Sequence, residues 1–353
     1  MTWFIAIIAF ILIMGLVIFV HELGHFITAK KTGIEVQEFG IGFPPRLFSF
    51  KRGETIYSLN LIPLGGFTKM LGEEDPSYPR SFASKRIRTR LLVLSAGSIM
   101  NILLPILLLS IAFMIPRQVV AGGDLKVIEV DQGSPAADAG IQKDDIILTA
   151  NGQPVSNFDE FHQIMEDADL AGQPVPMVLE RDGGEVNVTV NPPYLEGATI
   201  GVRLQLVNPY YETVSYPIWK AISEGFRQTW NIIAMSVKGL VSIVTGQAGV
   251  EIVGPIGIAQ ATGEVVQFGV ASLLIWAALI SAIIGIMNLL PIPMLDGGRI
   301  GFVLLEWIRR GKRISPERER MAHFVGFVLL MTLVIVVSYF DLSRLIGGGS
   351  ILP

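Results

Sequence analysis

Two histidines and a glutamate stand together at the end of a long apolar run near the N-terminus. His21 and His25 are four residues apart, and Glu22 lies between them, so the segment matches the pattern H-E-x-x-H. On a helix, positions i and i+4 project from one face a turn apart, so both imidazoles can bind one metal ion. Glu22 can take a proton from an attacking water and pass it to a leaving amine. The pattern therefore predicts a metal-dependent hydrolytic site.

The location of the motif favours this interpretation over two ordinary hydrogen-bonded histidines near a helix end. Residues 3–20 carry no charged side chain, and residues 3–29 are long enough to cross a bilayer. No basic residue precedes the run and no small-residue cleavage site follows it, so we expect an uncleaved span rather than a signal peptide. Ionisable groups at membrane depth are costly and are usually functional. We therefore place the metal motif in a membrane helix.

The composition supports a membrane protein with a water-soluble part. The chain has 353 residues, of which 51% are hydrophobic and 16% charged, and its mean hydropathy is +0.54. The net charge of -4 and the lack of a basic patch give no reason to expect nucleic acid as a partner. The absence of cysteine excludes disulfides and thiolate metal ligands.

A second candidate ligand lies near the other end of the chain. Asp296 is the only charged residue between Glu264 and Arg299. A lone carboxylate at membrane depth needs a partner, and a metal ion is the obvious one. Pro291 and Pro293 precede it and break the helix, which frees backbone carbonyls where they can line a wet cavity. An aspartate at the membrane interface beside a simple kink is the alternative.

Hydropathy and punctuation divide the rest of the chain into further elements. Four spans are expected, at residues 3–29, 91–115, 267–290 and 321–340. Between the first two we expect short strands at 35–39, 47–51 and 55–61, which form either a small sheet dipping toward the membrane or an ordinary cytoplasmic hairpin. The second span contains Gly97-Ser98-Ile99-Met100-Asn101, a small-residue face suited to close helix packing, with Asn101 as an interhelical hydrogen-bonding group.

Between the second and third spans the composition becomes acidic and rich in glycine. The run 133–141, with 144–148 and 151–152, resembles a PDZ domain, and residues 157–170 would be its helix. Residues 175–181 and 185–191 are joined through Asp182-Gly183-Gly184 and are typical of a β-hairpin. PDZ domains bind extended peptides by adding a strand to a sheet edge. The element order suits the circularly permuted bacterial form, whose peptide-binding loop we place near residues 197–202.

Two segments flank the third span. Residues 217–244 have apolar positions at helical spacing interrupted by charges, which favours an amphipathic helix in the interface, although the start of a span is the alternative. A loop is expected at 254–257 and a basic loop at 299–320.

The positive-inside rule then places the basic segments 30–90 and 299–320 in the cytoplasm. Both termini and the PDZ-like domain lie outside, and the metal motif and Asp296 both lie near the cytoplasmic side.

Three segments together resemble the site-2 protease family of intramembrane zinc metalloproteases, and most closely its bacterial regulator-of-sigma-E protease group. They are 21–25, 254–259 and 288–298. The resemblance implies Zn²⁺ held by His21, His25 and Asp296, and Glu22 as general base. It also implies that Asn288 helps to hold the substrate backbone or its oxyanion.

The same resemblance extends to the substrate. Residues 63–70 resemble the family's membrane-reentrant β-hairpin, which aligns an extended substrate strand. The candidate substrate-binding residues are Leu64, Gly65, Gly66, Phe67, Asn101 and Pro291. The chain departs from the enterobacterial pattern in having room for one PDZ-like domain instead of two. It also has Gly97-Ser98 where many members have Gly-Pro.

The resulting fold class is a polytopic α-helical membrane protein with about four transmembrane helices, a small membrane-associated β-sheet and an inserted PDZ-like α/β domain. The expected segments are a transmembrane catalytic half (1–118), the PDZ-like domain (119–207), an amphipathic helix with its loop (208–266) and a C-terminal transmembrane half (267–353). The expected function is cleavage of transmembrane segments of membrane-protein or peptide substrates, such as anti-sigma factors or remnant signal peptides. The expected location is the bacterial inner membrane, with membrane lipids and a PDZ peptide ligand as further partners. A membrane ion or metal transporter and a PDZ-bearing scaffold are the alternatives.

Overall fold

The computed structural model describes residues 2–195, 199–246 and 253–347. The chain divides into two compact units. The first comprises Met1–Ile115 and Tyr216–Pro353, and the second is Pro116–Ser215. Residues 208–214, expected in the segment after the PDZ-like domain, therefore belong to the second unit, in which they end a long strand.

Among its described residues, the first unit has four helices that are long and apolar enough to cross a membrane, as the hydropathy predicts. They lie within α1 (Thr2–Lys31), α2 (Ile87–Met114), α7 (Val270–Leu289) and α9 (Pro316–Ile346). Within this unit α2 is central, since it contacts α1, α5, α7 and α8. Side chains from α1, α2 and α7 form one buried apolar cluster, which includes Ile13, Val17, Leu108, Leu109 and Ala278.

Three further helices complete this unit and change two expectations. α5 (Ile218–Thr245) is a continuous helix, as expected, and packs against α2. The loop expected at 254–257 is wrong, because α6 (Pro255–Val266) begins there with Gly254 as its N-cap. Proline suits the first helical position because it lacks an N–H, and the buried Asp341 accepts the Gly257 N–H at 2.8 Å. Because of these contacts, a helix begins at the glycine-proline segment where a loop was expected.

The basic loop expected at 299–320 is also partly helical, since α8 (Asp296–Ile308) covers its first part. The burial of α8 explains the difference: Val303 and Glu306 face inward, and Glu306 pairs with the buried Arg90 of α2 at 2.6 Å. Scattered basic residues hid this amphipathic pattern in the sequence. Because α8 begins at Asp296 and packs against α2, it connects this residue to the core of the first unit.

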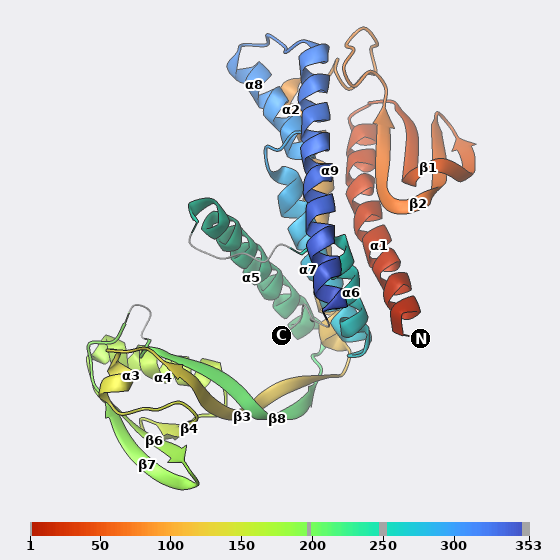
Figure 1. Ribbon diagram of the computed structural model, residues 1–353. Coiled ribbons are helices and arrows are strands. Elements are labelled where there is room, and N and C mark those ends of the chain that lie inside the picture. The colour runs from red at the N-terminus through yellow and green to blue at the C-terminus, as the bar shows by residue number, and fades with distance from the viewer. Residues whose placement is uncertain (1, 196–198, 247–252, 348–353) are drawn as a thin grey trace. The chain divides into compact units, whose positions relative to one another are not determined.

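The strands of the first unit are longer than expected. β1 (Val36–Arg52) joins two predicted strands into one, and β2 (Thr55–Met70) extends the third predicted strand, 55–61, to Met70. Both strands bend, so they pair twice: residues 36–41 lie between 56–59 and 66–70, and residues 46–52 pair with 55–60. The bend in β1 passes through Gly42, whose positive φ of 79° suits glycine. Segment 66–70 therefore lies at an edge of the sheet, beside the C-terminal half of α1 (Figure 1).

Ion pairs hold the turn between β1 and β2 in place. Glu54, in the turn between the strands, accepts hydrogen bonds from Arg80 at 2.8 Å and from Lys30 at 2.7 Å. These two bonds, the one from Arg80 first, lower the pKa of Glu54 to about 2. The carboxylate consequently stays charged at every physiological pH and holds the sheet to the end of α1.

The second unit is an antiparallel sheet with two helices. Its strands are β3 (Arg117–Val130), β4 (Ile146–Ala150), β5 (Gln153–Pro154), β6 (Val175–Arg181), β7 (Gly184–Val190) and β8 (Val202–Val214). Their order is β7-β6-β4-β3-β8, with β5 on β4. α3 (Pro135–Asp138) and α4 (Phe158–Ala171) complete it, and Asn157, the first residue of the expected helix 157–170, is the N-cap of α4.

The predicted hairpin and helix of this unit are present. β6 and β7 are joined through Asp182 and Gly183, both with positive φ, as a two-residue hairpin turn requires. The apolar face of α4 is buried against the sheet through Phe161, Ile164 and Met165. The peptide-binding loop placed near 197–202 falls partly outside the described residues, which exclude 196–198; Val202 begins β8.

An ion pair with a buried carboxylate joins the residue before β4 to the last residue of β6. Asp145, whose side chain is fully buried, binds Arg181 through both oxygens at 2.7 Å and also accepts the Gln142 N–H. The hydrogen bonds that Arg181 donates to Asp145 raise the pKa of Arg181. Removing one partner of such a pair leaves the other charge without compensation, which is strongly destabilising.

We therefore expect Asp145→Asn to destabilise the second unit by about 3 kcal/mol. Limited proteolysis of the full chain should cut between residues 116 and 215 about a hundredfold faster, because 1.4 kcal/mol is a factor of ten. Asp144→Asn is the matched control, since Asp144 is exposed and pairs with the half-buried Lys126. Equal proteolysis of the two variants would show that the buried pair is unimportant.

Candidate metal centre

Three donor atoms from two distant segments converge in the first unit. His21 and His25 lie one turn apart on α1, and Asp296 is the first residue of α8. Their donor atoms form a nearly equilateral triangle: Nε2 to Nε2 is 3.2 Å, and Asp296 Oδ2 is 3.0 Å from His21 and 3.1 Å from His25. Among the described residues, these three side chains form the group that could hold a metal ion. The structure thus brings together the three residues expected from the sequence.

The hydrogen bonding of His25 shows why this triangle suits a cation. Nδ1 of His25 lies 2.8 Å from the Val93 carbonyl oxygen, which can only accept, so Nδ1 carries the hydrogen. The neutral ring then presents a lone pair at Nε2, toward another imidazole nitrogen and the carboxylate of Asp296. That lone pair and the carboxylate repel each other unless a proton or a metal ion lies among the three donor atoms.

The dimensions and chemistry of the donors fit zinc. Two imidazole nitrogens and one carboxylate oxygen are a donor set found in catalytic zinc sites, which keep a fourth position open. Tetrahedral bonds of 2.0–2.1 Å place the donors about 3.3 Å apart. The observed separations of 3.0–3.2 Å are close to that value.

Two glycines allow α2 to approach the histidines closely. A Cβ at Gly97 would overlap Nε2 of His25 and lie 2.8 Å from Nε2 of His21. A Cβ at Gly24, on α1, would overlap the carbonyl oxygen of Ala96. The small-residue face predicted for the second span therefore serves the metal centre itself, by letting the α2 backbone form its wall.

The start of α8 is held by equally close backbone packing. A Cβ at Gly297 would overlap the carbonyl oxygen of Leu290, and one at Gly298 would lie 2.5 Å from that of Ile292. Met294 has a φ of 86°, and its N–H donates to Nδ1 of His323 on α9 at 2.8 Å. The segment between α7 and α8 therefore folds back on itself and delivers Asp296 to the histidines.

Glu22 lies beside the metal ligands without joining them. Its Oε2 accepts a hydrogen bond from Oγ1 of Thr68 at 2.8 Å, and Thr68 lies on the edge segment of β2. A Cβ at Gly66 would lie 2.9 Å from Glu22 Cγ. No sequence signal singles out Thr68, because its contact depends on how the sheet edge lies against α1.

A cavity of about 460 Å³ connects these groups. Among the residues that line it are Glu22, His25, Asp296, Arg299, and 66–70 of β2. Gly66 and Phe67, two of the expected substrate-binding residues, thus line the same cavity as the metal ligands. Gly65 and Pro291 are not among its described lining residues, and the side chain of Leu64 lies outside the described part of the chain.

The two asparagines occupy different surroundings. Asn101 is fully buried, with Nδ2 3.5 Å from Nδ1 of His21, and its Oδ1 has no partner among the described residues. Asn101 is not among the described residues that line the cavity. Asn288 is half-buried in the last turn of α7 and is not among the described residues that line the cavity.

Comparisons with known proteins point to one peptidase family. The profile of Peptidase family M50 matches residues 9–333. The zinc metalloprotease RasP of Oceanobacillus iheyensis is 33% identical, over 96% of this chain and 99% of its own length. The proteins named zinc metalloprotease RasP from Bacillus licheniformis (32% identical; 96% and 99% covered) and Geobacillus kaustophilus (31% identical; 96% and 98% covered) are similar over the same extent.

The close approach of α2 leads to a test that needs no substrate. Gly97→Ala adds a methyl group where Nε2 of His25 lies, so we expect the purified protein to lose most of its bound metal. Gly15→Ala is the matched control on α1, because a Cβ there meets nothing within 4 Å. Metal analysis of both variants measures the effect. Full occupancy in Gly97→Ala would mean that the histidines do not depend on this packing.

Proposed function

The chain belongs to peptidase family M50, and from this premise we propose that His21, His25 and Asp296 form its zinc centre. The protein is a zinc-dependent intramembrane endopeptidase of the site-2 protease type, which acts on membrane-protein substrates. The observation that carries the assignment of the site is the triangle of donor atoms held between membrane helices. The transporter and scaffold alternatives are not favoured by a match to a peptidase family.

Each side chain near the centre has a proposed role. A bound zinc ion would polarise the scissile carbonyl and make an attacking water more acidic. Glu22 accepts the proton of that water and delivers it to the leaving amine. Thr68 holds the Glu22 carboxylate in position through their hydrogen bond of 2.8 Å.

We assign Asn101 a different role from the substrate contact expected from the sequence. Ligating histidines usually donate their second N–H to an oxygen, which fixes the ring. Turning the Asn101 amide would bring its partnerless Oδ1 to Nδ1 of His21. Asn288 remains a proposed backbone or oxyanion contact, supported by the family resemblance and by its position just before the break that leads to Asp296.

The edge of β2 is the proposed site for the substrate backbone. A transmembrane helix has its amides engaged in hydrogen bonds, so it must unwind before a peptide bond can be attacked. An unwound segment needs new partners, and a free strand edge supplies them by strand addition. Support for this role is the position of 66–70, which lie at the sheet edge, line the cavity and include the hydrogen-bond donor to Glu22.

The membrane setting follows from charge and from the relatives. Exposed apolar side chains on α1 and α9, such as Leu12, Leu329 and Ile335, suit contact with lipid. We propose the inner membrane of a bacterium, because the similar proteins are bacterial. The basic segments 30–90 and 299–320 then face the cytoplasm, with the termini and the second unit outside.

We further propose that the second unit is a PDZ-like domain that selects substrates. Its antiparallel sheet, the helix α4 and the motif residues 133–141 support this identity. Strand addition of a peptide end would determine which proteins reach the membrane site.

The first test separates chemistry from metal binding. Glu22→Gln should keep its zinc, because Glu22 is not a ligand, and should cleave a transmembrane peptide about 10²–10⁴-fold more slowly. Asp296→Ala, by comparison, should lose zinc and activity together. Cleavage at the wild-type rate by Glu22→Gln would remove this residue from the mechanism.

The second test concerns the PDZ-like domain. Phe113 and Tyr216 are joined by a backbone hydrogen bond of 2.9 Å, so a short flexible linker can replace residues 117–214. We expect the shortened protein to retain zinc and to cleave short transmembrane peptides, with reduced discrimination among substrates of different external sequence. A shortened protein that binds zinc but cleaves no peptide would show that the domain belongs to the catalytic machinery.

A further inference from the structure

The free edge of β2 has a defined direction. The Leu71 N–H donates to the backbone carbonyl oxygen of Glu35 at 2.8 Å, so it points toward the rest of the sheet. Because successive N–H groups of a strand point to opposite sides, those of Met70, Thr68 and Gly66 point to the free edge. An added strand would bond to these alternate residues, which also line the cavity.

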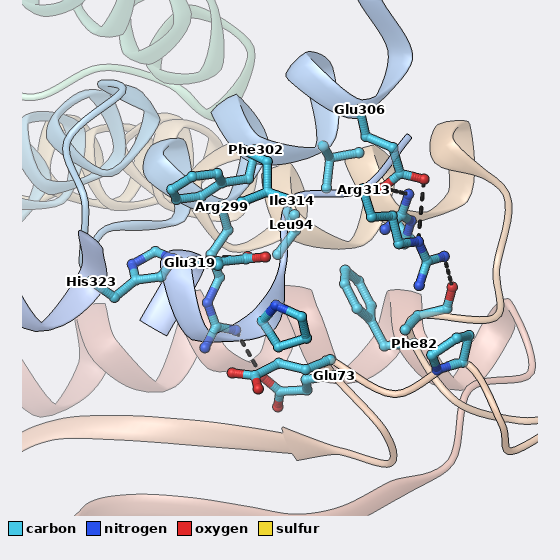
Figure 2. Close-up of a pocket in the computed structure, with 16 residues that line it drawn as sticks. Glu73, Phe82, Leu94, Arg299, Phe302, Glu306, Arg313, Ile314, Glu319 and His323 are labelled. Carbon is cyan, nitrogen blue, oxygen red and sulfur yellow. Dashed lines mark hydrogen bonds and ion pairs between the residues drawn. The ribbon is translucent and has the colours of Figure 1, made fainter. Parts of the chain in front are cut away.

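One of these three donors is already occupied. The Met70 N–H donates to Oε1 of Glu73 at 3.1 Å. The other oxygen of Glu73 pairs with Nη1 of Arg299 on α8 at 2.9 Å, and Figure 2 shows the two side chains meeting. Arg299 lies only three residues beyond Asp296, so Glu73 connects the end of the strand to the helix that carries a metal ligand.

The remaining two donors lie where the chemistry takes place. Thr68 bonds to the Glu22 carboxylate, and Gly66 lies against the Glu22 side chain. Met70 is one two-residue repeat farther along, about 6.8 Å from Thr68. With Glu73 in place, an added strand can use the edge beside the base but not the edge at Met70.

We propose that Glu73 is the stop that ends the added substrate strand and so sets which peptide bond lies at the zinc centre. The inference rests on the proposed function and defines the specificity of that same site. Without the stop, the substrate can slide along the edge until it also bonds to Met70. A slip of one residue would turn every substrate side chain to the other face, so the allowed slip is two residues.

The sequence supplies a matched control for the charge of Glu73. Glu74 is its neighbour and also pairs with an arginine, Arg320, at 2.8 Å. Only Glu73 of the two caps a donor of the strand. Loss of an acidic group and its ion pair can therefore be separated from loss of the cap.

The experiment maps the bond cut in a single-span transmembrane peptide by mass spectrometry, using the zinc-loaded full chain in detergent. Glu73→Ala should add a second cut two residues from the wild-type position. Glu73→Gln keeps an oxygen acceptor for the Met70 N–H and loses the charge, so it should cut only at the wild-type position. Glu74→Ala should also keep the wild-type cut. Zinc content measured on each variant reports whether its fold is retained.

Several outcomes would overturn the proposal. They are an unchanged cut in Glu73→Ala, an equal shift in Glu74→Ala, and a Glu73→Ala protein that holds zinc but cleaves nothing. If Glu73→Ala loses zinc, Glu73→Asp decides, because its shorter side chain keeps the charge without reaching Met70 and should give the shifted cut. Absence of cleavage by the wild-type protein would instead count against the proposed function.

Discussion

The convergence of two imidazole nitrogens and a carboxylate oxygen inside an apolar helix bundle is the constraint on which this structure depends. These donor atoms lie 3.0–3.2 Å apart, an arrangement that is favourable only with a proton or a metal ion among them. The surrounding chain must therefore hold the donor atoms in place, and no neighbouring side chain can occupy their space. Gly97 meets the second requirement, since its missing Cβ leaves the space that the His25 ring nitrogen occupies.

The proposed substrate is a helix whose backbone N–H and C=O groups are already hydrogen-bonded to one another. The edge of β2 lies against α1 and can offer new backbone hydrogen bonds to an unwound substrate, at the point where Glu22 is held. Thr68 belongs to both functions, as a residue of the edge and as a donor to Glu22. The catalytic group and the substrate strand are thus positioned by one element, and a shift in one moves the other.

The sequence predicts those features of the site that are local or compositional. The two histidines follow from helical spacing, and Asp296 from being the only charge in a long apolar region. The four spans follow from hydropathy and agree with α1, α2, α7 and α9. Contacts between distant segments could not be predicted in this way. The pairing of Thr68 with Glu22 depends on two bent strands that pair twice, and the helix α8 was hidden because its buried Glu306 and its basic residues resemble a polar loop.

The placement of Asp296 shows how remote contacts serve the metal centre. At its near end, α8 is fixed by backbone packing of Gly297 against the end of α7. At its far end, Glu306 is paired with Arg90 of α2 and lies 3.4 Å from Arg313, which itself donates to the Ala83 carbonyl (Figure 2). A buried ion pair adds little net stability but is costly to break, so it favours one arrangement of α8 over others. Because α2 also forms the wall behind the histidines, the ion pair fixes Asp296 relative to the helix that fixes its partner ligands.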